Sequence, residues 1–194
     1  QDRLWVSLPL AIYALALSTL IAFPAGIYAA SRRGGLGDVS IMGATQLGVA
    51  IPNFWFAMML VLVFAINLRW FSAGGFPGWD NGLFTGLKAL TLPAIALALP
   101  QAAILARVMR SSMLDILNED FIRTARAKGA GQRNILFLHA LKNAAVPIVT
   151  VIGIGIALLI GGAVVTESVF AIPGLGRLTV DAILRRDYPV IQGV

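Results

Sequence analysis

The chain has 194 residues, of which 58% are hydrophobic and 12% charged, and its net charge is +6. Soluble domains are about half apolar and about a quarter charged, so this composition favours a membrane protein. The lack of cysteine excludes disulfides and cysteine-based metal or redox sites, and a single histidine argues against a histidine-rich metal site.

The apolar residues gather in four long runs, and a helix that crosses a bilayer core needs about 20 of them. The predicted spans cover residues 4–30, 41–67, 89–106 and 144–165. Pro52 predicts a kink inside the second run. The fourth run is rich in glycine, which lets membrane helices approach closely, so we expect this helix to be buried. These runs predict one all-α domain over residues 1–194, a polytopic transmembrane helical bundle.

Two loops, over residues 68–88 and 166–188, are predicted on one side of the membrane. The turn 31–40 and the stretch 107–143 lie on the other side and hold nine of the 15 basic residues, which predicts that this side is cytoplasmic. The charged residues lie mostly beside the spans, where anionic lipid and the membrane orientation account for the positive net charge. Nucleic acid is therefore not an expected partner. We expect the chain to be cut at both ends.

The stretch 120–129 predicts a short amphipathic helix below the membrane. Asp120 is the expected N-cap and Gly129 the expected C-cap, and Phe121, Ile122 and Ala125 can share one face. A second helix is expected over 132–143, with Ile135, Leu138 and Leu141 at helical spacing. These properties alone allow two interpretations. The segment is either an ordinary basic connector or an element to which a soluble partner binds.

The run Arg123-Thr-Ala-Arg-Ala-Lys-Gly129, followed by His139-Ala-Leu-Lys-Asn143, closely resembles the cytoplasmic loop of the permeases of binding-protein-dependent ABC importers. In that family the loop begins Glu-Ala-Ala, has a glycine four residues after the second alanine, and ends near Leu-Pro. Ala125, Gly129 and Leu141 match this pattern. The departures at Arg123, Thr124, His139 and Lys142 are typical of the dipeptide, oligopeptide and nickel branch.

The resemblance extends from about Ala25 onward, through Ile51-Pro-Asn-Phe-Trp55 and Val169-Phe-Ala-Ile-Pro-Gly-Leu-Gly176. The family has six spans, so the two that are not visible would lie before Gln1 and after Tyr188. By analogy alone, the loop around Ile172-Pro-Gly-Leu-Gly176 is expected to be an outer gate.

The resemblance implies a type I importer in the plasma (inner) membrane of a bacterium or archaeon. A second permease subunit would complete the pathway for peptides or related small solutes. Two ATPase subunits would bind ATP and Mg, and an extracytoplasmic solute-binding protein would deliver the cargo. No cofactor, metal or catalytic residue is expected on this chain, and the sequence lacks a Gly-x-x-x-x-Gly-Lys-Ser/Thr phosphate loop.

Within the cytoplasmic loop, the resemblance implies a set of residues that couple to the ATPase. These are Arg123, Thr124, Ala125, Arg126, Lys128, Gly129, His139 and Leu141. The basic members can bind either acids on the ATPase or lipid headgroups, and both alternatives stay open. A packed loop residue is favoured over a ligand for His139.

Polar residues inside spans are costly and often functional. Gln46, Asn53 and Gln101 are candidates for lining the pathway, and hydrogen bonds between helices are the alternative for each. Glu167 is expected to face the outer vestibule or the binding protein, or else to be a solvated loop acid.

Two other classes of function compete with this interpretation. A secondary transporter would usually carry a charged residue at mid-membrane for ion coupling, and the four predicted spans have none. A membrane enzyme would need a cluster of titratable side chains, for which this sequence offers little.

Overall fold

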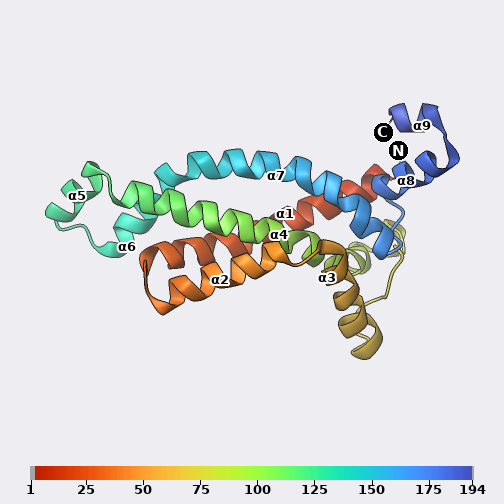
Figure 1. The fold of residues 1–194 in the computed structure, drawn as a ribbon, viewed down its shortest axis with the longest axis horizontal. Coiled ribbons are helices and arrows are strands. Elements are labelled where there is room, and N and C mark those ends of the chain that lie inside the picture. The colour runs from red at the N-terminus through yellow and green to blue at the C-terminus, as the bar shows by residue number, and fades with distance from the viewer. Residues whose placement is uncertain (1–2, 194) are drawn as a thin grey trace. The chain divides into compact units, whose positions relative to one another are not determined.

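The computed structural model describes residues 3–193, and Gln1, Asp2 and Val194, where the sequence predicts cut ends, lie outside the described residues. Every regular element within 3–193 is helical, which confirms the predicted all-α class (Figure 1). The helices divide into two compact units, and the long helices contribute to both. Each unit is described by itself.

Three helices are long and apolar enough to cross a membrane. They are α1 (Leu4–Ser31), α4 (Leu83–Leu117) and a continuous helix, Gln132–Val169, that comprises α6 (Gln132–Asn134), the π-helical η3 (Ile135–Ala140) and α7 (Leu141–Val169). A fourth span exists only if α2 (Leu36–Ala50) is counted together with α3 (Asn53–Leu60) and the π-helical η1 (Val61–Asn67).

The break between α2 and α3 lies at Pro52, where the sequence predicts a kink. Pro52 adopts an extended conformation, with φ −61° and ψ 129°, and the two helical segments on either side of it are bent by 98°. Proline has no N–H to continue the helical bonds and restricts the residue before it to extended conformations. The predicted interruption at Pro52 is confirmed, and the bend of 98° makes the second predicted run either one broken span or a re-entrant segment.

Unit 2 consists of Ser18–Ala50 and Pro100–Gly155. α2 turns back from the end of α1 at Gly34, whose φ is +75° (Figure 1). Its core joins α1, α4, η3 and α7 through a set of buried apolar side chains, which are Ala30, Met109, Met113, Leu136, Ala140, Ala144 and Ile148. Gly26 allows α1 to approach α4, because an added Cβ would lie 2.8 Å from the carbonyl oxygen of Ala106.

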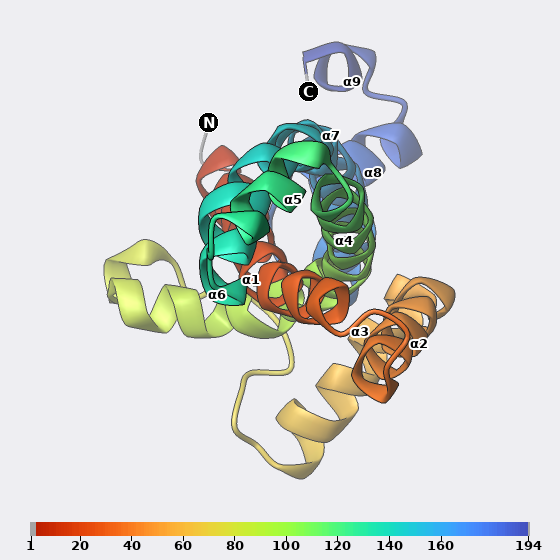
Figure 2. The ribbon, with the colours of Figure 1, turned by 90° about the vertical axis from the view of Figure 1, so that its left-hand side faces the viewer.

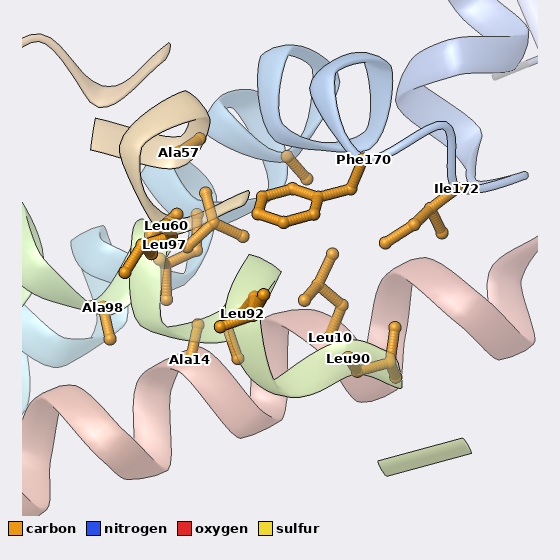
Figure 3. Packing of buried hydrophobic residues seen from close by; sticks show 14 of the residues in the cluster. Leu10, Ala14, Ala57, Leu60, Leu90, Leu92, Leu97, Ala98, Phe170 and Ile172 are labelled. Carbon is orange, nitrogen blue, oxygen red and sulfur yellow. The ribbon is translucent and has the colours of Figure 1, made fainter. Parts of the chain in front are cut away.

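Unit 1 consists of residues 3–17, Ile51–Leu99 and 156–193. It also contains the 3-10 helix η2 (Trp79–Asn81), α8 (Leu175–Arg185) and α9 (Tyr188–Gly193), so the predicted loops 68–88 and 166–188 are partly helical. In its core, Phe170 at the end of α7 points toward Leu60, Leu92 and Leu10 (Figure 3).

The fourth predicted span is helical as expected, but the expectation that it is buried is wrong. Only 22% of its most apolar window is buried inside the chain, against 67% for α4. The glycines of this helix show why it is exposed, since only two of the four face α4. An added Cβ at Gly155 or Gly162 would touch a side chain of α4. At Gly153 and Gly161 it would meet no atom of residues 3–193 within 4 Å.

Candidate functional site

The predicted cytoplasmic helix is α5 (Asp120–Ala127), and its C-terminal turn is the expected glycine turn. Gly129 has φ +85°, and its N–H donates to the Arg126 carbonyl at 2.9 Å. The N–H of Ala130 donates to the Ala125 carbonyl at 3.1 Å, which completes a Schellman motif. The predicted N-cap is off by one residue: Glu119 holds that position, and Asp120 is the first helical residue.

The inward face of α5 is narrower than predicted. Ile122 is completely buried and α5 contacts η3, but Phe121 is 43% exposed. On the following helix Ile135 is buried, whereas Leu138 is 68% exposed. Phe121 and Leu138 therefore do not belong to the packed faces to which the spacing assigns them.

The outward face of this segment combines positive charge with apolar side chains. Arg123, Arg126 and Lys128 are exposed. The ion pair of Arg123 with Asp120, at 3.3 Å between exposed side chains, adds little stability. Phe121, Phe137 and Leu138 are also exposed. α5 and α6 lie together at one end of unit 2, so this end presents a mixed basic and apolar surface (Figure 2).

His139 and Leu141 lie on the helix against which α5 packs, and both are half-buried. The carbonyl of His139 accepts a hydrogen bond from the Asn143 amide at 2.7 Å. No cluster of three potential metal ligands occurs within residues 3–193. The half-buried position of the His139 side chain agrees with a packed residue. The coupling residues are therefore gathered in one part of the chain, and their role in coupling stays a prediction.

A partly buried ion pair that sequence analysis missed joins α2 to α4. The guanidinium of Arg110 donates two hydrogen bonds to the Asp38 carboxylate, at 2.5 and 2.7 Å. The N–H of Gly34 donates to the same carboxylate at 2.9 Å, and the Asp38 side chain is only 4% exposed. Local sequence hints only at the contact between Asp38 and the preceding glycine turn; Arg110 is 72 residues away.

The polar candidates for the pathway differ in their surroundings. In unit 2, Gln46 is exposed and accepts a hydrogen bond from Arg107 at 3.0 Å, whereas Gln101 is buried against Gly155 and its amide nitrogen has no partner within the described residues. In unit 1, the Asn53 amide donates a long bond of 3.4 Å to Thr166. The side-chain oxygen of Asn53 is buried and has no partner within the described residues. A hydrogen bond between helices thus accounts for Gln46, whereas Asn53 is satisfied only in part, and a pathway role stays a prediction for each.

Glu167 is completely buried, so in this structure it neither faces open space nor is a solvated loop acid. Its carboxylate accepts a hydrogen bond from the Ser7 hydroxyl, and another from the N–H of Arg177 at 3.1 Å. Ser7 in turn accepts from the N–H of Leu175 at 2.8 Å. Glu167 and Ser7 together cap the N-terminus of α8, where free N–H groups favour a negative charge.

The role of Gly174 follows from this carboxylate, because an added Cβ there would overlap it. The sequence motif around Pro173 and Gly174 predicts a turn but does not reveal the buried acid that it covers. Ser7 was missed because its partner, Glu167, is 160 residues away in the sequence.

Comparison with known proteins identifies the family of this chain. The model of the family described as "Binding-protein-dependent transport system inner membrane component" matches residues 22–194. A probable peptide ABC transporter permease protein of Sinorhizobium fredii is 45% identical over 100% of this chain and 62% of its own length. The oligopeptide transport system permease protein AppB of Bacillus subtilis is 43% identical over 99% of this chain and 61% of its own length.

A solved structure of the MetNI methionine ABC transporter in an inward-facing conformation has a similar fold. Its TM-score is 0.75 at 18% sequence identity, over 93% of this chain and 78% of that chain. The fold is therefore that of a type I importer permease. The chain spans about three fifths of the length of the curated relatives that it matches.

Proposed function

The chain belongs to the family of binding-protein-dependent transport system inner membrane components, and from this membership we propose that it forms the membrane-spanning permease part of an ATP-driven peptide importer. Its apolar helices make it a multi-pass membrane protein. The proposed location is the plasma membrane of a bacterium or archaeon. The names of the similar relatives support peptides as the cargo class.

The partners in this proposal are a second permease subunit, two ATPase subunits and an extracytoplasmic binding protein. ATP and Mg would be bound by the ATPase subunits, because this sequence has no phosphate loop. Closure of the ATPases on ATP would draw the docked helices together and tilt the spans between inward-open and outward-open states. This chain would then transmit force without taking part in hydrolysis.

The observation that carries the proposal is α5 with its left-handed glycine. The Schellman turn fixes the direction in which the chain leaves α5, and Ile122 anchors the helix to unit 2. The outward face, with Phe121, Arg123 and Lys128, is left free of contacts that would bury it. A short, anchored helix with a basic and apolar outer face suits docking into a groove on a soluble partner.

The substitution Gly129→Val tests this role. At φ +85° a β-branched residue is an outlier and costs about 1–3 kcal/mol locally. This is too little to unfold the bundle but enough to tilt α5. The variant should insert into the membrane at the parental level and lose most of its association with the ATPase subunits and most of its transport.

Gly131→Val is the matched control, because Gly131 has φ −66° and an added Cβ there meets no described atom within 4 Å. The measurement is a pull-down of the ATPase subunits combined with a transport assay, both normalised to inserted protein. Gly131→Val should retain both activities. A Gly129→Val protein that holds its ATPases and transports at the parental rate would show that the segment is only a connector.

A further inference from the structure

The segment between η1 and α4 borders an open hollow of about 640 Å³ within unit 1. None of the candidate site residues above lines it. Its walls include two cationic side chains, several aromatic rings and two hydroxyl groups, which come from Arg69, Trp70, Phe71, Ser72, Thr85 and Lys88. A volume in this range is typical of sites that bind small molecules or headgroups.

The walls of the hollow are fixed by contacts to distant parts of unit 1. The N–H of Gly75 donates to the Phe170 carbonyl at 2.8 Å, and an added Cβ at Gly74 would lie 2.7 Å from the same oxygen. Phe76 packs edge-on against Trp79, with ring centroids 5.1 Å apart. The Trp79 indole N–H donates to the Trp5 carbonyl at 2.7 Å. The loop is thereby tied to α7 and α1, so the hollow is preformed.

The charge of the hollow is positive and not neutralised by the chain. No acidic side chain of the described residues lines it, and neither Arg69 nor Lys88 forms an ion pair within 3–193. The Lys88 ammonium lies 5.9 Å from the centroid of the Phe71 ring. Two cations without acidic partners at the rim of one concave surface attract an anion.

The residues around this hollow have the composition of a membrane interface. Thr85 and Lys88 belong to the first two turns of α4, a membrane-spanning helix. Leu83 and Phe84, at the same end of α4, are 68% and 80% exposed, and Trp70 is 58% exposed. Exposed apolar and tryptophan side chains beside a lysine at the end of a span are typical of the membrane interface.

We propose that this hollow binds the phosphate group of an anionic phospholipid, with Arg69 and Lys88 as its cationic ligands. The aromatic walls contact the glycerol and the upper acyl chains, and the hydroxyl of Thr85 faces the headgroup. The hydroxyl of Ser72 instead donates to the Gly74 carbonyl at 2.8 Å and holds the loop. Phosphate is the chemistry recognised, and the membrane is the source. This site does not depend on the proposed transport function.

The test measures lipid bound to the complete protein, purified in detergent and titrated with phosphatidylglycerol or phosphatidylcholine, by native mass spectrometry. The parent should prefer phosphatidylglycerol. The pair Arg69→Gln and Lys88→Gln should weaken its binding roughly thirtyfold, from about fivefold for each cation. Arg185→Gln with Arg186→Gln removes the same charge from exposed positions of α8 and its C-cap, and should leave the preference unchanged.

The exchange Arg69→Lys with Lys88→Arg keeps both charges and checks that the hollow still forms; it should retain the preference. The proposal is overturned if the glutamine pair still selects phosphatidylglycerol, or if the control pair loses as much. It is also overturned if the charge-conserving pair loses the preference equally. Competition by inorganic phosphate without any preference for the lipid would assign the hollow to a free anion and overturn the membrane as the source.

Discussion

The carboxylate of Glu167 connects three helices of unit 1, since it lies at the end of α7, accepts a bond from Ser7 of α1 and caps α8. Removal of this group leaves the N–H of Arg177 and the hydroxyl of Ser7 without their acceptor in a buried place. An unsatisfied buried donor costs about 1–3 kcal/mol. The acid is therefore a structural element of unit 1, at the junction of α1, α7 and α8.

We expect Gly174→Ala to lower the thermal unfolding midpoint, because its Cβ would overlap the Glu167 carboxylate. Overpacking of this kind costs about 1–3 kcal/mol. In a Glu167→Ala background the same change should cost much less, since the obstructing group is gone. The measurement is a double-mutant cycle by thermal unfolding of the purified protein, and additive effects would contradict the account. Glu119→Ala, at an exposed acid, is the control.

At the scale of single residues, the sequence predicts features that depend on residues nearby in the chain. The turn at Gly129 was predictable because a glycine after an amphipathic stretch favours a left-handed C-terminus. The burial of Glu167 and the pairing of Asp38 with Arg110 were not, because both depend on residues brought together from distant segments. The assignment of Phe121 to a packed face was wrong, since a single short helix leaves its rotation open by one position.

Among the elements, α2 is held to α4 by the ion pair of Asp38 and Arg110. Arg110→Gln would leave a buried carboxylate without its bidentate partner, which costs about 3 kcal/mol. Arg107→Gln is the control on the same helix, because it loses the same charge and only a bond to the exposed Gln46. It should cost under about 1 kcal/mol.

A double variant combines Asp38→Asn with Arg110→Gln and thereby removes both charges of the ion pair. It should recover part of the lost stability, because no unpaired charge stays buried. Unfolding midpoints of the purified variants give the comparison. A double variant less stable than Arg110→Gln alone would argue against a mutual interaction.

The positions of the helices were largely predictable, but the way in which they are used was not. Apolar length located α1, α4 and α7, because a span requires a long run of such residues. Pro52 was expected to kink a span, and the helices on either side of it are indeed bent by 98°, more sharply than a kink within one continuous helix. The glycines of α7 were expected to bury it, but side chains of α4 occupy only two of the four. Which face of a span meets a neighbour is a property of packing and not of composition.

For the whole molecule, the central claim is that ATP on partner subunits drives import through this chain. Sequence resemblance located the segment that we propose couples to the ATPase subunits, because α5 and its glycine turn are encoded within a few residues. The two-unit division and the capped start of α8 are tertiary features that no single motif contains. The contrast with a secondary transporter can be decided only by the energy source.

The direct measurement is uptake of a labelled oligopeptide into proteoliposomes that contain the complete permease with its ATPase subunits and binding protein. Uptake should require ATP and the binding protein, and should be insensitive to the collapse of ion gradients. Purified permease without its partners should neither hydrolyse ATP nor take up peptide. Uptake by the permease alone, driven by an imposed ion gradient, would contradict the account.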